Sequence, residues 1–577
     1  MRYMSAKPGV EQLKNVFIER GVRGIVFSPG SRNAPLVVAF YDDDRFEKLV
    51  IPDERSAAFY ALGMAEQWDA PVAVMCTSGS ALLNYYPAVS EAFYRNIPLL
   101  VVSADRPLEW TDQGDGQTIR QTGVFQNHIV AETRMFEKPD HADQKWWNRR
   151  EANRVIQKAI GQGGGPAHIN FPFQEPLYEI NAVNENSVSM PTARYEMPKA
   201  VLRDDQLAMI EKAWRTHSRK LIICGQLPPN PVLQGKLKQL AKDKSVAIVV
   251  ENTSNLQDQR FIHCIDRTIN SFLDEAPKIF QPDLLITMGG AVISKKIKKY
   301  LRTYGPEMHW KIGAEFPMMD TYQHLSHTFP MAPETFIDTL LDDRLDRNVS
   351  RYGEQWKQLD YQVQTLHDDY FQDAPYADLS VFELLMDVVP DNSTLHFANS
   401  SVVRYGQLFD PIKVIQYYCN RGTSGIDGSM STAIGGAIAK DDRMHTIIVG
   451  DLSFFYDSNA LWNKYLPSNF RVFLINNGGG GIFSIIPGPH STPAKKDYFV
   501  TTNDADAESI CSAFDVNYYE AKDMKSISNQ LQAFYERQTN NRPAVMEIHT
   551  PEEENAQVLK TYFEKIKIPS IVQLDDE

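Results

Sequence analysis

The most constraining feature of the sequence is a segment in which two short apolar runs flank a helical pattern. The runs are residues 446–449 and 472–475; Gly-Asp follows the first, and Asn-Asn with four glycines follows the second. A strand, a helix and a second strand in this order predict a βαβ unit with parallel strands. Ligands of open α/β sheets bind beyond the carboxyl ends of the strands. The segment therefore predicts a ligand site at this edge of a sheet.

Oxygen atoms at these two strand ends favour a hard metal ion. Asp451 supplies a carboxylate, Asn477 an amide oxygen and Gly479 a backbone carbonyl. Without sulfur or imidazole, this set suits Mg²⁺ (or Mn²⁺) and leaves coordination positions for diphosphate oxygens and water. Gly-Asp and Asn-Asn-Gly-Gly are each ordinary turn sequences when they occur alone. Their combination in one βαβ unit is what predicts the metal site.

Length, charge and cysteine usage limit the functions that the chain can have. A chain of 577 residues is long enough for several domains, each with its own core. Its net charge of −14 argues against nucleic acid or an anionic membrane as partner, so an anionic substrate would need local Arg and Lys. The five cysteines are scattered without a CxxC pair, and no apolar run approaches the ~20 residues that span a bilayer. We therefore expect a cytoplasmic protein without membrane insertion, a disulfide framework or a zinc site.

The alternation of apolar runs and helical segments predicts an α/β protein built from doubly wound parallel sheets. We expect three domains, at residues 1–182, 199–340 and 376–577, with polar connections near 184–198 and 340–375. The first and third domains share one alternating plan of strands and helices. Strands are predicted at residues 24–27, 71–76 and 99–103 in the first domain, and at 221–224, 247–250, 284–288 and 310–312 in the second.

Polar residues also follow the predicted strands of the first domain. Ser31, Arg32 and Arg106 stand in loops at strand ends. Gln117 lies in a polar, glycine-bearing loop that is long enough to reach over a site. Glu54 stands where a strand gives way to a helix, a position that the helix dipole alone would favour for Glu.

Several longer blocks of sequence are distinctive when they are taken together. They are SPGSRNAPL (28–36), DERSAAFYALG (53–63), TSGSALLNYYPAVSEA (77–92), ADRP (104–107), DGQTIRQ (115–121), NSSVVR (399–404), NRGTSGIDGSMSTAIGGA (420–437) and GDLSFFYD (450–457). In this order they resemble the 2-succinyl-5-enolpyruvyl-6-hydroxy-3-cyclohexene-1-carboxylate (SEPHCHC) synthase family of thiamine-diphosphate enzymes. Leu452 departs from the general metal–diphosphate motif of those enzymes, in which many members have a second glycine. The middle domain matches weakly, apart from the lysine run 295–299.

The resemblance implies a cofactor, a reaction and an assembly. The three expected domains would be pyrimidine-binding, central and diphosphate-binding, and would hold thiamine diphosphate with Mg²⁺ (or Mn²⁺). The reaction would be decarboxylation of 2-oxoglutarate and 1,4-addition of the succinyl carbanion to isochorismate, a transferase step of menaquinone biosynthesis that releases CO₂. The enzyme would be a homodimer or homotetramer whose active sites are shared between two subunits.

The resemblance also assigns roles to single residues. Glu54 would hydrogen-bond the pyrimidine ring of the cofactor and promote the tautomer that takes up the C2 proton. The remaining cofactor contacts would be Ile426, Gly428, Gly450, Asp451, Leu452, Ser453, Asn477, Gly479, Ile482 and Phe483. Arg32, Arg106, Lys295 and Lys296 would face isochorismate, Ser400, Arg404 and Arg421 the succinyl carboxylate, and Ser31, Gln117, Phe483 and Ile486 would complete the substrate site. Arginine forks suit the carboxylates of both substrates, whereas a lysine run is also typical of a solvated helix face.

Two other interpretations are open on the sequence. Another thiamine-diphosphate-dependent decarboxylase or carboligase could use the same scaffold, with an apolar acyl pocket and, in many cases, a flavin in the middle domain. The arginines at the strand ends argue against this class. A cofactor-binding scaffold without enzymatic activity is the second alternative, but it would not need Glu54, Asp451 and Asn477 together.

Overall fold

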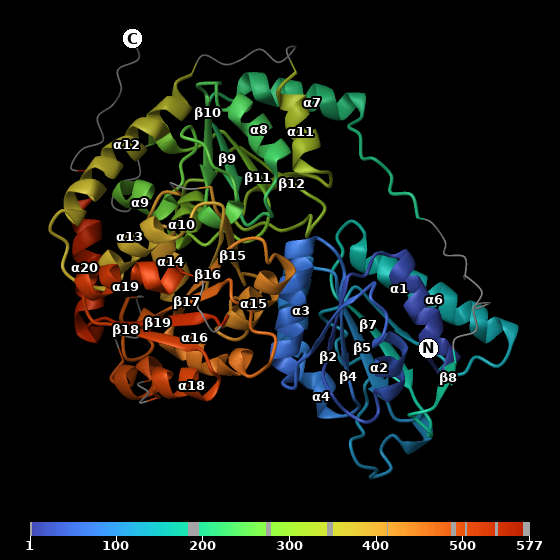
Figure 1. The fold of residues 1–577 in the computed structure, drawn as a ribbon. Coiled ribbons are helices and arrows are strands. Elements are labelled where there is room, and N and C mark those ends of the chain that lie inside the picture. Colours follow the sequence, from blue (N-terminus) through green and yellow to red (C-terminus); the bar gives the residue numbers. More distant parts are fainter. Residues whose placement is uncertain are drawn as a thin grey trace.

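The structure is a computed structural model that describes residues 3–182, 195–272, 278–342, 350–411, 414–485, 492–501, 505–536 and 541–568. These residues form three bodies, each built on a parallel sheet (Figure 1), so the predicted α/β class is confirmed. The central body lies at the top of Figure 1, the first at the lower right and the third at the lower left. The expected connection 184–198 lies largely outside the described residues, and the domain boundaries stay predictions.

The first sheet has the order β3-β2-β4-β5-β7-β6 and only parallel neighbours. Its inner strands are buried along their length, which is why they read as continuous apolar runs. The strands are β2 (Gly24–Phe27), β3 (Glu47–Val50), β4 (Val72–Cys76), β5 (Leu99–Asp105), β6 (Ala131–Arg134) and β7 (Ala167–Pro172), with the antiparallel pair β1 (Tyr3–Ser5) and β8 (Ile180–Ala182) beside them. The helices are α1 (Pro8–Glu19), α2 (Ala34–Phe40), α3 (Glu54–Trp68), α4 (Ser80–Asn84), α5 (Tyr86–Arg95) and α6 (Ala142–Ile160).

The third sheet repeats this topology. Its order is β15-β14-β16-β17-β19-β18, so both sheets run 2-1-3-4-6-5 when their strands are counted along the chain. The strands are β14 (Thr394–Phe397), β15 (Gln416–Cys419), β16 (His445–Gly450), β17 (Phe470–Asn476), β18 (Asn517–Ala521) and β19 (Ala544–His549). The helices are α13 (Asp378–Val388), α14 (Ser401–Gly406), α15 (Ser429–Ala439), α16 (Asp451–Tyr456), α17 (Ile482–Ile485), α18 (Ala507–Ala513), α19 (Met524–Tyr535) and α20 (Glu552–Lys565).

The central sheet has the order β10-β9-β11-β12-β13, again with parallel neighbours. The expected polar connection at 340–375 contains a long helix, α12, that packs on β10 and α20. The strands are β9 (Lys220–Cys224), β10 (Val246–Val250), β11 (Leu284–Met288), β12 (Met308–Ile312) and β13 (Leu325–Phe329). The helices are α7 (Asp204–Thr216), α8 (Pro231–Leu240), α9 (Ile265–Thr268), α10 (Lys295–Thr303), α11 (Pro333–Leu340) and α12 (Tyr352–Phe371).

Helix α3 of the first body packs closely on α15 of the third, and the two lie side by side in Figure 1. Small residues allow this approach: a Cβ on Gly63 would lie 2.0 Å from the carbonyl oxygen of Thr432, and one on Gly435 would lie 2.2 Å from that of Tyr60. Because Glu54 begins α3, this contact fixes the predicted catalytic carboxylate relative to the third body.

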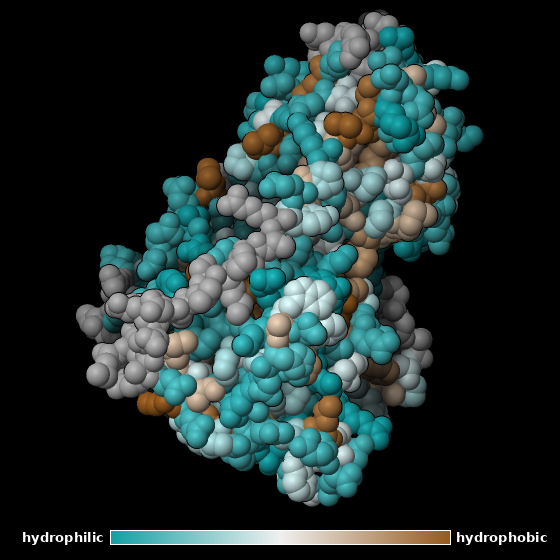
Figure 2. Space-filling model, turned by 90° about the vertical axis from the view of Figure 1, so that its right-hand side faces the viewer, coloured by the Kyte–Doolittle hydropathy of each residue, from teal (hydrophilic) through white to brown (hydrophobic). Residues whose placement is uncertain are grey.

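The molecule is two-lobed when it is seen from the side of the first body (Figure 2). On this face of the described residues, strongly apolar side chains form small, separated spots among polar ones. Scattered apolar side chains of this kind are ordinary for a folded protein surface. This face therefore shows no broad apolar patch over the part of the chain that the structure describes.

Candidate active site

The carboxyl ends of β16 and β17 bring Asp451 and Asn477 to one edge of the third sheet. The two strands are neighbours in register, with Gly450 opposite Ile475. Asp451 is 3% exposed; its Oδ1 accepts from the backbone N–H of Leu452 at 2.7 Å, and its buried Oδ2 has no hydrogen-bond partner among the described residues. Burial raises the pKa of the Asp451 carboxyl to about 6. A buried carboxylate oxygen that accepts no hydrogen bond from the described residues is available to a cation.

The amide of Asn477 is oriented by its surroundings. Its Nδ2 donates to Oδ2 of Asp378 at 3.0 Å, and Asn477 is 7% exposed. The backbone N–H of Gly479 faces the Asp451 carboxylate, and Gly479 has a φ of 149°. Within the described residues, no group of three or more His, Cys, Asp or Glu side chains could hold a metal. A cation at Asp451 would therefore depend on amide and carbonyl oxygens, a set that suits Mg²⁺.

The predicted cofactor residues 426–428 lie against the start of α16. The hydroxyl of Ser453 donates to the backbone carbonyl of Ile426 at 2.6 Å. Gly428 has a φ of 71° and precedes α15, and a Cβ at this position would lie 2.1 Å from the ring of Phe59 on α3. The left-handed backbone and the close approach both require glycine here. Ile426 remains 38% exposed, with a side chain available to a ligand.

The glycines after Asn477 lead into the short helix α17, which carries Ile482 and Phe483. The backbone N–H of Gly480 donates to the carbonyl of Val500, and the rings of Phe483 and Phe499 lie 5.8 Å apart. These two contacts hold α17 against residues 495–500. Ile486, which the sequence analysis assigned to the substrate site, lies outside the described residues.

In the first body, Glu54 begins α3 beside the end of β4. Asp53 caps the helix by accepting from the backbone N–H of Ser56 at 3.2 Å. Burial raises the pKa values of the Cys76 thiol and the Tyr85 hydroxyl, and the negative charge of Glu54 raises both further. Glu54 therefore lies close to both groups, at the carboxyl edge of the first sheet.

Arg32 follows β2 and Arg106 follows β5, two strands on either side of β4, and the charges of the two arginines act on one another. Arg32 is 5% exposed; it donates to the carbonyl of Phe173 at 3.0 Å and pairs with Glu175 at 3.1 Å. Burial lowers the pKa of the Arg32 guanidinium, and the positive charge of Arg106 lowers it further. Arg106 pairs with Asp115 at 3.2 Å. Guanidinium groups whose positive charges act on one another in this way favour a bound anion. Ser31, beside Arg32, is exposed.

The loop that carries Gln117 folds back over the turn after β4. Gln117 has a φ of 53°, and its backbone lies against Gly79. The anchor is Gln121, which accepts from the backbone N–H of Gly79 at 3.1 Å and donates to the carbonyl of Ala104 and to Asn170. Gln121 was not predicted as a site residue, although it stands four positions after Gln117 in the same block of sequence.

A second arginine pair lies at the carboxyl edge of the third sheet. Arg421 donates to Oδ1 of Asn399 at 2.7 Å, and burial together with the charge of Arg421 lowers the pKa of Arg404. In the part of the chain that the structure describes, the buried Nε atoms of both arginines have no hydrogen-bond partner. Ser400 precedes α14, the helix that carries Arg404, and has a φ of 75°, a strained conformation for serine. Guanidinium groups with free Nε donors suit a bound carboxylate.

The lysines of α10 separate in the structure. Lys295 is exposed, whereas Lys296 donates to the carbonyl of Asp266 and to Asn270 and lies 3.5 Å from the ring centre of Phe563. Burial lowers the pKa of the Lys298 ammonium group, and the positive charges of Arg421 and Arg404 lower it further. Lys298 thus shares the electrostatic environment of the second arginine pair, and the sequence analysis did not single it out. The roles of Lys295 and Lys296 stay predictions.

One carboxylate of the first body holds the loop of the second arginine pair. Glu91 on α5 is 1% exposed and accepts from the backbone N–H groups of Gly422 and Thr423, at 2.9 and 2.7 Å. Burial raises the pKa of the Glu91 carboxyl, while these hydrogen bonds oppose the rise. The position of Arg421 is therefore coupled to the first body within the same chain.

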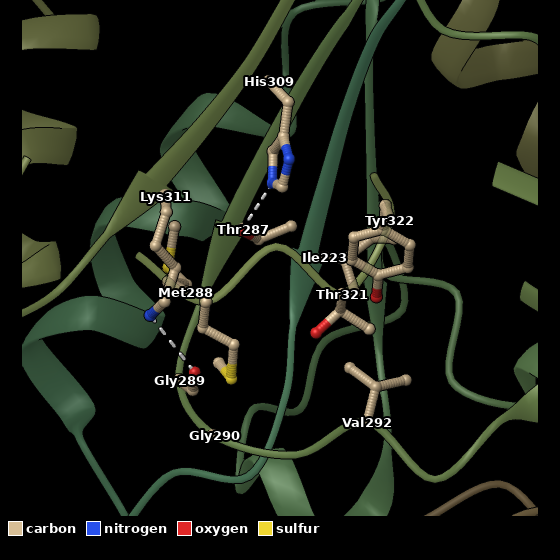
Figure 3. A pocket seen from close by; sticks show the side chains of 11 residues that line it. Ile223, Thr287, Met288, Gly289, Gly290, Val292, His309, Lys311, Thr321 and Tyr322 are labelled. Atoms are coloured by element: carbon tan, nitrogen blue, oxygen red, sulfur yellow. Dashed lines mark hydrogen bonds between the residues drawn. The ribbon is translucent and has the colours of Figure 1, made fainter. Parts of the chain in front are cut away.

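The central sheet has a pocket of its own, at the carboxyl ends of β9, β11 and β12 (Figure 3). In it, Lys311 donates to the carbonyl of Gly289, and His309 lies 2.9 Å from the hydroxyl of Thr287. The pocket is lined by Ile223, Thr287, Met288, Gly289, Gly290, Val292, His309, Lys311, Met319, Thr321 and Tyr322. None of these residues belongs to the predicted site, which lies instead at the edges of the first and third sheets.

Three family models match the chain in consecutive segments. They are described as the N-terminal TPP binding domain of thiamine pyrophosphate enzymes (residues 8–131), the middle domain of thiamine pyrophosphate enzymes (193–397) and their C-terminal TPP binding domain (401–548). The predicted cofactor, thiamine diphosphate, is thereby confirmed.

Curated relatives narrow this assignment. A SEPHCHC synthase of Flavobacterium johnsoniae is 43% identical over 95% of this chain and 97% of its own length. One of Christiangramia forsetii is 42% identical over 98% of this chain and 100% of its own length. The chain belongs to the SEPHCHC synthase family. A further synthase of this family, from Bacteroides thetaiotaomicron, is 35% identical over 98% of the chain and 99% of its own length. The predicted family is thereby confirmed.

A solved structure shows the same fold outside the SEPHCHC synthase family. The benzoylformate decarboxylase of Polynucleobacter necessarius superposes with a TM-score of 0.70 over 94% of this chain and 99% of that chain, at 14% identity. At this identity the likeness concerns the fold alone. A search of the described helices found none with the length and apolar character needed to cross a membrane.

Proposed function

We propose that the chain catalyses the reaction for which the SEPHCHC synthase family is named: decarboxylation of 2-oxoglutarate and addition of the resulting succinyl group to isochorismate, in menaquinone biosynthesis. The observation that carries this proposal is the combination of two arginine pairs, an Asp451 oxygen that accepts no hydrogen bond from the described residues, and a Glu54 that begins α3. Both substrates are dicarboxylates, and paired guanidinium groups are the donors that bind such anions best.

The third body would hold the metal and the diphosphate of the cofactor. Asp451, Asn477 and the backbone of Gly479 would bind Mg²⁺ (or Mn²⁺), and Ser453 would fix the backbone of Ile426 beneath the cofactor. When bound, thiamine diphosphate supplies the electron sink that allows decarboxylation of a 2-oxo acid. The protein supplies position and electrostatics, because Asp451 is buried at the sheet edge and Gly428 allows α3 to approach.

Glu54 would control the proton of the aminopyrimidine. Its carboxylate would hydrogen-bond a ring nitrogen and shift a proton toward the ring, which prepares the amino group to accept the C2 proton. Asp53 caps the helix and fixes the backbone of this turn, and the side chain of Arg55 is held by the carbonyl of Tyr456 at 2.6 Å. Because the residues on both sides of Glu54 are held by these contacts, the backbone of Glu54 has a fixed position at the start of α3.

The arginines would divide between the two substrates. Arg32 and Arg106, under the loop that carries Gln117, would face isochorismate with Ser31, Lys295 and Lys296. Arg404, Arg421 and Ser400 would hold the distal carboxylate of 2-oxoglutarate, and Phe483 and Ile486 would cover the substrates. The unused Nε donors of Arg404 and Arg421 support their part of this division.

The assembly would be a homo-oligomer in which two subunits build each site. Within one chain, the side chain of Arg55, which follows Glu54, donates to the backbone carbonyl of Tyr456. Tyr456 ends α16 and Asp451 begins it, so these two residues are about 8 Å apart along the helix axis. Tyr456 and Trp462 are 54% and 52% exposed, and aromatic side chains of this kind are enriched at interfaces. Five buried cysteines without disulfides support a reducing, cytoplasmic location.

Carbon dioxide release tests the reaction. With thiamine diphosphate and Mg²⁺, the protein should release CO₂ from 2-oxoglutarate, and isochorismate should increase the rate and yield one SEPHCHC for each CO₂. The assay should follow CO₂ and product in parallel, with pyruvate as the control substrate. Equal rates with pyruvate, or a flavin spectrum in the purified protein, would place the chain in another class of thiamine-diphosphate carboligase.

Two arginine variants test the division of substrates. Arg404→Ala should reduce the use of 2-oxoglutarate, since a charge-assisted hydrogen bond contributes about 1.5–3 kcal/mol, or roughly 10- to 100-fold in kcat/KM. Arg106→Ala should instead raise the KM for isochorismate. Steady-state kinetics with one substrate varied at a time measures both effects. The division is wrong when both variants impair the same substrate alone.

A further inference from the structure

Two buried carboxylates lie beneath the Asn476-Asn477 pair. Oδ2 of Asp378 accepts from Nδ2 of Asn477 at 3.0 Å, and Oε1 of Glu547 accepts from Nδ2 of Asn476 at 2.6 Å. Asp378 begins α13 and Glu547 lies in β19, so the two acids come from different parts of the third body. Asp378 is 2% exposed and Glu547 is 3% exposed. Each asparagine amide thus has one carboxylate of its own.

This arrangement fixes which end of each amide faces outward. An asparagine has a donor end and an acceptor end, whereas an ionised carboxylate only accepts. The carboxylate therefore takes the Nδ2 end and turns Oδ1 away. Asn476 shows the result, because its Oδ1 accepts from the backbone N–H of Gly478 at 3.1 Å. For Asn477, no hydrogen bond from the described residues reaches Oδ1, which leaves this oxygen for a ligand.

Asp378 is itself held in place from three sides. Its Oδ1 accepts from the hydroxyl of Thr550 at 2.6 Å, and its backbone N–H donates to Oδ1 of Asn555 at 2.8 Å. Both oxygens of the Asp378 side chain therefore accept hydrogen bonds. Burial raises the pKa of the Asp378 carboxyl, and the hydrogen bonds from Thr550 and Asn477 oppose the rise. Asp378 thus joins α13, the end of β19 and α20 to the tip of β17.

We propose that Asp378 is a positioning residue for the metal–diphosphate site: it fixes the amide of Asn477 with Oδ1 toward Asp451. The inference rests on the proposed cation site at Asp451 and Asn477. Without Asp378 the Asn477 amide can rotate and turn its NH₂ group toward the cation. The partial positive charge of the NH₂ group repels the cation. Partners that orient metal ligands in this way typically change metal affinity by about 10- to 100-fold when they are removed.

A matched control separates positioning of Asn477 from a purely structural role for Asp378. The hydroxyl of Tyr376 donates to the carbonyl of His549 at 2.8 Å and so ties the same two segments without touching Asn477. Asp378→Ala should weaken Mg²⁺-dependent binding of thiamine diphosphate by about 10- to 100-fold. Tyr376→Phe should leave this affinity unchanged. Calorimetric titration with thiamine diphosphate at fixed Mg²⁺ measures the affinity, and thermal unfolding of the cofactor-free proteins measures the structural effect.

A reciprocal exchange decides the question even if Asp378→Ala does not fold. In the double variant Asp378→Asn with Asn477→Asp, the hydrogen bond runs in the opposite direction and an oxygen still faces the cation. This variant should bind Mg²⁺ and thiamine diphosphate far more tightly than Asp451→Ala. Asp451→Ala is the reference, because it removes the carboxylate ligand of the proposed cation site. Wild-type affinity in Asp378→Ala, or no binding by a folded double variant, overturns the inference. Tight binding by Asp451→Ala would overturn the cation site itself, and with it this inference.

Discussion

We expect the Glu54→Gln variant to bind thiamine diphosphate and Mg²⁺ but to lose turnover by about 10²- to 10⁴-fold, the usual contribution of a positioned acid or base. Glutamine keeps the size of the side chain and its hydrogen-bonding reach. It cannot share a proton with the pyrimidine ring, so the amino group is not prepared to accept the C2 proton. Hydrogen–deuterium exchange at C2 of the bound cofactor, followed by NMR, should fall together with kcat.

Asp53→Asn is the matched control for this experiment. It neutralises the adjacent carboxylate, and asparagine also caps helices, so α3 should begin as before. This variant should retain C2 exchange and turnover, and both variants should retain cofactor affinity by calorimetry. Unchanged C2 exchange in Glu54→Gln would remove Glu54 from this role. A loss of cofactor affinity in place of turnover would give Glu54 a binding role instead.

The strands that the sequence predicted best are those buried on both faces. The predicted ranges 24–27 and 284–288 coincide with β2 and β11, because continuous apolar runs end abruptly in turn residues there. The edge strand β13 was missed, and the edge strand β3 was expected before Glu54 but without bounds. Their residues are largely half-buried or exposed, so they carry no continuous apolar run. Local hydrophobicity therefore identifies strands that are buried along their length, including the edge strand β10, and not strands that are partly exposed.

Helix α12 was missed for a related reason. The stretch 340–375 is rich in charged and polar residues, and it was interpreted as a connection. Its apolar residues form a narrow stripe: Trp356, Leu359 and Val363 are buried at spacings of three and four residues. A stripe this narrow is hard to separate from a polar segment until the surface that it covers is known.

Some residues of the candidate site could likewise be predicted from the local sequence, whereas others depend on contacts between distant parts of the chain. Asp451 and Asn477 could be predicted because each directly follows an apolar strand. Asp378 could not, because it lies 99 residues from Asn477 along the chain. Glu91 lies 331 residues from Gly422, the residue whose backbone it holds. Contacts of this kind depend on the packing of separate elements, which the pattern of a single sequence does not encode.

Subunit complementation should distinguish a shared active site from one within a single chain. Glu54→Ala and Asp451→Ala should each be inactive alone, because each removes one side of every site. If Glu54 and Asp451 of one site come from different subunits, a mixed dimer contains one doubly damaged site and one intact site. Random exchange of equal amounts gives about half mixed dimers, so roughly a quarter of all sites should recover. Turnover after joint refolding or co-expression measures this recovery.

The control is a mixture in which both partners carry changes on the same side of the site. Glu54→Ala mixed with Glu54→Gln cannot restore an intact site in any pairing, so its activity should stay at that of the separate variants. Differently tagged subunits should be co-purified to show that mixed dimers form. Mixed dimers of Glu54→Ala and Asp451→Ala without recovered activity would place Glu54 and Asp451 of each site in one chain. In that case Glu54 on α3 would act together with Asp451 on the α16 of the same subunit. Within the chain, however, Arg55 contacts Tyr456 at the end of α16, whereas Asp451 lies at its start.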